Sequence, residues 1–194
     1  MRSPQYFVIK SKDGHRYDNV RNGIIISTSK EDHIVTTREA IVIQTPIGYD
    51  GPIEIGDAVL VHHNTFRLYF DMQGREKSSW NYFKDDLFFI DDPYAFKKPD
   101  GQWKGIGRYV FVSPVPNDQS GITTTDAEMP LVGIIRFGND EMLELGLNEG
   151  DMVVFEPESE YPFHVDGEKV YRMYTKNLTI KLNEQDNGIK EEDN

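Results

Sequence analysis

The chain has 194 residues, enough for one domain or two small ones. Hydrophobic residues make up 38% and aromatic residues 12%, which excludes a disordered chain. The absence of cysteine excludes disulfides, thiolate nucleophiles and cysteine-based metal sites. The formal net charge of -12 argues against nucleic acids and anionic membrane surfaces as partners, because these require a basic surface.

The first residues, MRSPQYFVIKSKDG, lack the apolar core of a signal peptide. No apolar run approaches the roughly 18 residues that a membrane helix requires. We therefore expect a cytoplasmic protein that does not contact membranes.

Short β-branched and aromatic runs follow one another along the whole chain, separated by Gly, Pro, Asp or Asn, and this spacing predicts an all-β protein with a sandwich or barrel architecture. Only residues 139–147, NDEMLELGL, have helical periodicity, over at most two turns. The predicted strands are 6–9, 24–27, 40–44, 58–61, 80–83, 87–90, 108–112, 131–135, 152–155, 170–174 and 178–182.

An internal repeat is visible in this series. The segment IGDAVLV at 55–61 recurs as EGDMVVF at 149–155, and the same order of features follows each copy. A variable loop is followed by a tight turn, an aromatic strand, a polar turn and a last strand. This order matches LFFI at 87–90 with LTIKL at 178–182. An ordered series of this length indicates a duplicated domain.

The segments upstream of the two Gly-Asp pairs also correspond, since residues 6–48 parallel residues 109–138. Two similar domains are therefore predicted, separated by a linker rich in Pro, Gly and charge and followed by a disordered acidic tail. The predicted boundaries are 1–91 and 106–184 for the domains, 92–105 for the linker and 185–194 for the tail.

Each half resembles the ten-kilodalton co-chaperonins, the GroES-like family. A strand leads into a long polar loop that holds a glycine and apolar residues, and a strand and the Gly-Asp segment follow. The second half carries the most specific match, GDMVVF…VDGEKVYRMYTKNLTI. The first half differs there, with MQGRE in place of the DGE turn. The resemblance covers nearly the whole chain twice and implies two tandem irregular small β-barrels.

The resemblance also implies a function. A homo-oligomer would cap a chaperonin ring in its ATP-bound state and assist the folding of unfolded client proteins without contacting them through a site of its own. The divergence from cellular members points to a viral or phage version. The implied docking residues are Gly23, Ile24, Ile25 and Ile26 in a mobile loop over 10–38, with Gly121 and Ile122 at the matching place in the second half.

Alternatives stay open for each of these assignments. Ile24–Ile26 are also good material for a core strand. Phe66 and Tyr161 fall where the family places an aromatic side chain facing the chamber, and packing inside a barrel is the alternative for both. A protein that keeps the β-barrel as a structural or interaction module, for example in a virus, is the alternative function.

The remaining chemical groups have simpler interpretations. On a strand, His62 and His63 would point to opposite faces and could not easily share a metal; we expect them where the strand leaves the barrel and enters a loop. The pairs Asp85–Asp86 and Asp91–Asp92 are typical of turns. No nucleophile elbow, HExxH, Walker loop or GxGxxG is present, so we expect no enzyme, no metal and no cofactor.

Overall fold

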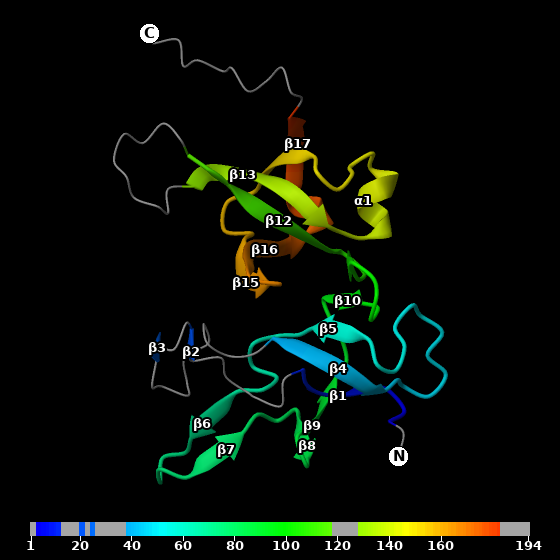
Figure 1. Ribbon diagram of the computed structural model, residues 1–194, viewed down its shortest axis with the longest axis vertical. Coiled ribbons are helices and arrows are strands. Elements are labelled where there is room, and N and C mark those ends of the chain that lie inside the picture. The colour runs from blue at the N-terminus through cyan, green and yellow to red at the C-terminus, as the bar shows by residue number, and fades with distance from the viewer. Residues whose placement is uncertain (1–2, 13–19, 22–23, 26–37, 118–127, 183–194) are drawn as a thin grey trace. The chain divides into compact units, whose positions relative to one another are not determined.

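The computed structural model describes residues 3–12, 20–21, 24–25, 38–117 and 128–182 (Figure 1). The described chain is all-β, as predicted, with one short α-helix and one 3₁₀ turn. It divides into two compact units, residues 1–103 and 104–194.

The first unit is built on a seven-stranded sheet in the order β11-β10-β5-β4-β1-β9-β8, and β2-β3 and β6-β7 form separate two-stranded sheets. All pairs with a defined register are antiparallel. The strands are β1 (Phe7–Ser11), β2 (Val20–Arg21), β3 (Ile24–Ile25), β4 (Glu39–Gln44), β5 (Ala58–Leu60), β6 (Leu68–Phe70), β7 (Glu76–Ser78), β8 (Tyr82–Lys84), β9 (Leu87–Ile90), β10 (Ala95–Lys97) and β11 (Trp103–Gly105).

The second unit is built on a six-stranded antiparallel sheet in the order β15-β16-β12-β13-β14-β17. Its elements are β12 (Tyr109–Pro116), β13 (Glu128–Phe137), α1 (Asp140–Glu144), β14 (Met152–Phe155), β15 (Tyr161–Val165), β16 (Glu168–Tyr174), the 3₁₀ turn Thr175–Asn177 and β17 (Leu178–Leu182). In the described residues neither large sheet closes into a barrel, so the expected pair of irregular small β-barrels is not confirmed.

The single helix falls inside the predicted window 139–147. Asn139 caps it, because its side-chain oxygen accepts the backbone N–H of Met142 at 2.8 Å. The Asn139 amide also donates to Thr175 Oγ1 at 2.8 Å, which ties the start of α1 to the segment before β17. Met142, the buried residue of α1, packs with Val110 and Ile135 in the core of the unit.

The pairing of the strands corrects the match between the two halves. In the first unit β9 pairs with β1, and in the second unit β16 pairs with β12 in the same position. Likewise β10 covers β5 as β17 covers β14. The strand LFFI therefore corresponds to β16 and not to LTIKL, whose true counterpart is β10.

This correction also changes the expected linker. Residues 92–105 supply β10 and β11 to the first sheet, and Tyr94, Ala95, Phe96 and Trp103 are buried there. The first unit consequently extends to Trp103 and not to residue 91. The predicted tail, residues 185–194, lies outside the described residues.

Candidate functional site

The segment predicted to dock on a chaperonin lies between β1 and β4. Ile24 and Ile25 form β3, which pairs antiparallel with Val20 and Arg21 of β2. This pair is a two-stranded sheet of its own, and β1 and β4 pair with each other and not with it. Ile24 and Ile25 therefore do not belong to the seven-stranded sheet of the first unit.

Gly23 and Ile26 lie outside the described residues, as do Gly121 and Ile122 of the second half. The sequence between the paired strands β2 and β3 is Asn22-Gly23, the dipeptide most typical of two-residue hairpin loops. This signal could have identified the hairpin from the sequence.

An ion pair connects the two ends of the 10–38 segment. Lys12 Nζ lies 2.5 Å from Glu39 Oε2, and the Lys12 backbone N–H donates to the Glu39 carbonyl at 3.2 Å. The chain therefore leaves the sheet and returns to it at one clamped point.

A comparable clamp lies at the C-terminal end of the second loop. Glu128, the first residue of β13, accepts hydrogen bonds from the ammonium of Lys169 at 2.7 Å and from the hydroxyl of Tyr171. The hydrogen bond to Glu128 raises the pKa of Lys169, and burial raises the pKa of Tyr171. Sequence reasoning missed this cluster, because its members are 41 and 43 positions apart.

The Gly-Asp turn that defines the repeat has a specific geometry in the first unit. Asp57 is buried, and its carboxylate accepts the backbone N–H of Glu54 at 2.7 Å and pairs with Lys98 Nζ at 3.0 Å. Gly56 has φ 95°, a conformation that favours glycine, and its N–H donates to the Val42 carbonyl at 2.8 Å. The turn thus joins β4 to β5.

The second unit repeats this geometry. Asp151 accepts the backbone N–H of Asn148 at 2.8 Å and pairs with Lys181 at 2.5 Å. Gly150 has φ 89° and donates to the Ile135 carbonyl at 2.8 Å. Because two separate sets of side chains reproduce one arrangement, the Gly-Asp repeat is structurally real.

The two aromatic residues expected to face a chamber differ in their environments. Phe66 is completely buried and packs edge-on against Phe88, with ring centroids 4.7 Å apart. The chamber-facing assignment is therefore wrong for Phe66, and the packing alternative holds. Tyr161 is half-buried, and the Arg172 guanidinium lies over its ring at 4.9 Å. Tyr161 remains a candidate surface residue.

His62 and His63 follow the end of β5, where the chain enters a loop, as expected. Because they are not on a strand, their rings can lie together, with centroids 4.1 Å apart. His62 Nδ1 accepts the N–H of Asn64 at 3.1 Å, so one ring nitrogen is used in a local turn. Within the described part of the chain, no group of three or more His, Cys, Asp or Glu side chains is placed to hold a metal.

The turn interpretation is correct for Asp85 and Asp86. They form the two-residue loop between β8 and β9, with φ 47° and 61°. Asp166 and Gly167 form the equivalent loop between β15 and β16, with φ 49° and 86°. The structural counterpart of the DGE turn in the first unit is therefore Asp85–Asp86 and not MQGRE.

No protein-family model and no curated protein matches this chain. Among the described residues no helix is both long enough and apolar enough to cross a membrane.

Proposed function

We propose that the protein is a tandem co-chaperonin-like protein of the GroES-like kind, acting in the cytoplasm, with a viral or phage origin. Gly23 and Ile24–Ile26 dock on the ATP-bound state of a chaperonin ring, and the capped ring then folds client proteins. The observation that carries this proposal is the separate β2-β3 sheet, which keeps Ile24 and Ile25 out of the core sheet. This proposal requires no catalytic group, metal or cofactor.

The energetics of docking require more than one copy of the loop. Burying three isoleucines stabilises a complex by about 1.5–3 kcal/mol each. Ordering the loop costs about 1–2 kcal/mol for each residue fixed, which offsets most of that gain. A homo-oligomer with several loops binds far more tightly, because each later loop binds at a high effective concentration. The clamp between Lys12 and Glu39 holds the loop ends in one place and lowers the ordering cost.

The second loop makes a smaller contribution in this proposal. At the place that matches the isoleucine triplet it has Gly121 and Ile122 followed by three threonines, so only one large apolar side chain remains to be buried. We therefore assign docking mainly to the first unit.

Co-sedimentation with a chaperonin from the same host, with and without ATP, tests the proposal. Wild-type protein is expected in the chaperonin fraction only with ATP, and Ile25→Asp is expected to abolish this binding. Ile47→Asp is the matched control, because Ile47 is an exposed isoleucine of the same unit outside the loop. Binding of Ile25→Asp at the wild-type level would remove the docking role.

A structural or interaction module that uses these β units without a chaperonin is the second candidate. The observation that favours it is a set of exposed aromatic side chains on β6 and β8 of the first unit. A wild-type protein that never binds chaperonin, but retains a partner that this surface binds, would support this candidate.

A further inference from the structure

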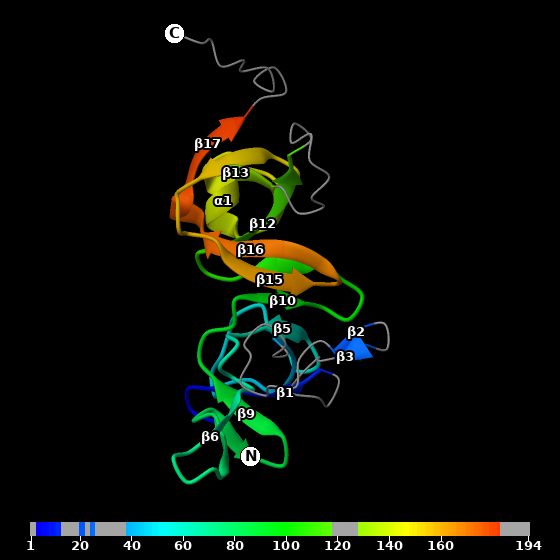
Figure 2. The same cartoon turned by 90° about the vertical axis from the view of Figure 1, so that its left-hand side faces the viewer.

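One face of the sheet in the second unit carries aliphatic side chains that are only partly buried. Residues that pair directly on neighbouring strands point to the same face of a sheet. Two rows of such partners cross β13, β14 and β17, of which β13 and β17 are labelled in Figure 2. We call these rows the aliphatic face; they are Val132, Val154 and Ile180, and Ile134, Met152 and Leu182. Ile180 is 56% exposed, and the other five are half-buried.

The aliphatic face lies on the side of the sheet away from the core. Ile135 and Val153, which alternate with its members along β13 and β14, are buried and belong to the core cluster of this unit. Because successive side chains of a strand point to opposite faces, the aliphatic face points away from that cluster. Packing of this core therefore does not require the six side chains to be apolar.

The first unit does not share this apolar face. The equivalent turns at Asp57 and Asp151, together with the strand registers, assign each position its counterpart. The counterparts of the two rows are Glu39, Leu60 and Ala95, and Ile41, Ala58 and Lys97. Two of them are charged, two are alanine and Leu60 is fully buried, so the aliphatic face is specific to the second unit.

The first unit carries an apolar face of another kind. The rings of Tyr6 and Phe83 both contact the ring of Phe89, with centroids 6.2 Å and 5.1 Å away. We call these three residues the aromatic face. Phe83 is 39% exposed and the other two are half-buried. The neighbouring Phe88 is fully buried, because it points to the opposite side of β9.

The second unit in turn lacks this aromatic face. Arg172 has the place opposite β12 that Phe89 has opposite β1. The Arg172 guanidinium lies over the rings of Tyr109 and Tyr161, at 5.1 Å and 4.9 Å from their centroids. A cation therefore stands where the first unit has a phenylalanine. One copy of the chain thus offers one aliphatic face and one aromatic face, on different units.

The charge of the two units indicates which surface of a second copy can cover the aliphatic face. Residues 1–103 contain 13 basic and 15 acidic residues, a net charge of -2, whereas residues 104–194 contain 8 and 18, a net charge of -10. Two second units would repel each other, because both are strongly acidic. The nearly neutral first unit is the better partner, and Lys84 Nζ adds a positive charge 5.5 Å from the Phe83 ring centroid.

We propose that copies of this chain associate head to tail, with the aliphatic face of one copy packed on the aromatic face of the next. Most of these side chains are half-buried already, so each contact covers less than the roughly 800 Å² per partner of a standard interface and is reversible. A contact between two different faces repeats from copy to copy, and closes into a ring or continues as a filament. It supplies the homo-oligomer that the proposed function uses, but it does not depend on chaperonin docking.

Sedimentation velocity of the protein alone, over a roughly hundredfold concentration range, tests the proposal. The wild type is expected to sediment faster as the concentration rises and to pass beyond the dimer. Ile180→Ser removes the most exposed side chain of the aliphatic face, and Phe83→Ser removes that of the aromatic face. Each variant alone should associate about tenfold more weakly or worse.

An equimolar mixture of the two variants distinguishes a head-to-tail contact from a two-fold contact. Ile180→Ser keeps its aromatic face and Phe83→Ser keeps its aliphatic face, so the mixture should form a heterodimer. Assembly should stop there, because the two faces left over are both altered. A two-fold contact through either face would instead let one of the variants associate by itself, and this result would contradict the proposal.

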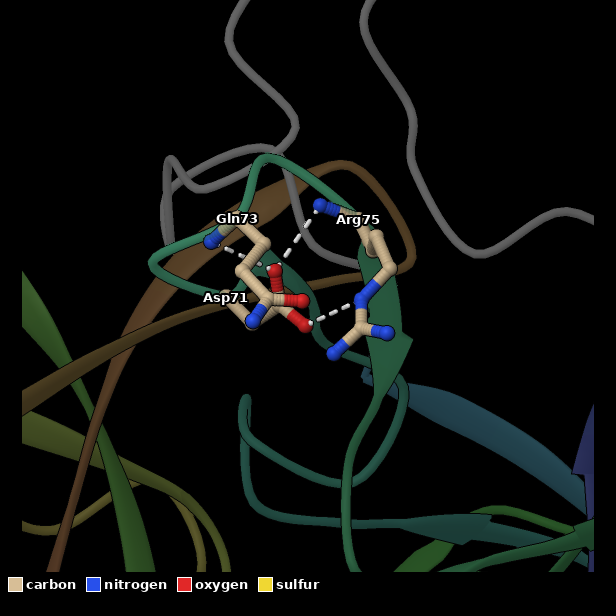
Figure 3. A network of polar contacts seen from close by, with 3 residues as sticks. All are labelled: Asp71, Gln73 and Arg75. Atoms are coloured by element: carbon tan, nitrogen blue, oxygen red, sulfur yellow. Dashed lines mark hydrogen bonds and ion pairs between the residues drawn. The ribbon is translucent and has the colours of Figure 1, made fainter.

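Met72→Ser is the matched control, because Met72 is a fully exposed apolar residue of the first unit outside both faces. Its turn is held by other residues (Figure 3). Asp71 Oδ1 accepts the backbone N–H groups of Gln73 at 2.9 Å and Arg75 at 3.0 Å, and Asp71 Oδ2 accepts the Arg75 guanidinium at 2.9 Å. Met72→Ser should therefore leave both the turn and the association unchanged.

Three further results would overturn the proposal: a wild type that stays monomeric at every concentration, a mixture without heterodimer, or an equal loss of association in Met72→Ser. Circular dichroism checks that each variant is folded, and Leu182→Ser and Tyr6→Ser are second variants, one for each face, with the same expected results. Ile25→Asp should assemble like the wild type, so a failure of assembly and a failure of chaperonin docking are distinguishable.

Discussion

Asp57 and Asp151 occupy equivalent turns in the two units and make the same contacts. Each carboxylate accepts a backbone N–H three residues earlier and pairs with a lysine on or next to the strand that covers the one after the turn, Lys98 after β10 or Lys181 of β17. They differ in burial, because the Asp57 side chain is 2% exposed and that of Asp151 is 20% exposed. The same motif is therefore expected to contribute more to the stability of the first unit than to that of the second.

Replacing each aspartate with alanine should separate the two cases. Asp57→Ala removes a buried carboxylate and leaves the part-buried backbone N–H of Glu54 without its acceptor, while Lys98 keeps the Glu54 side chain as a partner, so we expect a loss of about 1–3 kcal/mol in the free energy of unfolding. Asp151→Ala exposes its former partners to water and should cost about 1 kcal/mol or less. Urea unfolding followed by tryptophan emission reports on the first unit, which holds both tryptophans, and far-UV circular dichroism reports on the whole chain. A larger loss in Asp151→Ala would contradict this ranking.

The second turn also gives a pH dependence. The hydrogen bond from Lys181 lowers the pKa of Asp151 below its ordinary value of 3.8. A lowered pKa in the folded state means that the unfolded chain binds the proton more readily, so this stabilisation is present above about pH 4 and is lost as the pH falls further. In Lys181→Met, the measured free energy of unfolding should therefore fall less than in the wild type as the pH is lowered below about 4. Parallel acid profiles for the wild type and Lys181→Met would show that the pair does not contribute.

A substitution in the loop between β8 and β9 should make the first unit more stable. Asp86 adopts φ 61°, a conformation that costs a non-glycine residue energy, and its counterpart in the second unit is Gly167. Asp86→Gly should therefore raise the melting temperature, by relief of about 0.5–1 kcal/mol. Gly167→Ala, the reciprocal change at φ 86°, should destabilise the second unit by about 1 kcal/mol. A destabilising Asp86→Gly would mean that the aspartate side chain makes a compensating contact.

Phe66 should behave as a core residue. Its ring is completely buried against Phe88, so Phe66→Ala should cost about 3–5 kcal/mol and unfold much of the first unit. Tyr161→Ala, at a half-buried position, should be milder and leave circular dichroism unchanged. Thermal unfolding of both variants checks this difference. A fully stable Phe66→Ala would contradict the packing seen here.

The class of fold and the repeat could be predicted from the sequence, because alternating apolar residues and the Gly-Asp turn are local signals. The order of strands after each turn could not. LFFI and LTIKL are both short apolar runs after a polar turn, and only their partners, β1 and β14, distinguish them. Residues 92–105 appeared to be a linker because charges and prolines surround the buried Tyr94, Ala95 and Phe96.

The loop position of the histidine pair could be predicted, but not the contact between the two rings. The alternation rule applies within a strand, and β5 ends at Leu60, before His62 and His63. Once the chain turns, the two rings can lie side by side, as they do here. The exposed positions of Trp80 and Phe83 were equally hidden, because an aromatic run in a predicted strand is usually assigned to the core.

Native mass spectrometry of the purified protein, alone and mixed with a chaperonin of its own host, tests the central claim most directly. The account predicts an oligomer of this chain that joins the chaperonin ring only when ATP is present, and a complex that Ile25→Asp does not form. A wild-type protein that remains separate from the chaperonin in every nucleotide state would contradict the co-chaperonin function.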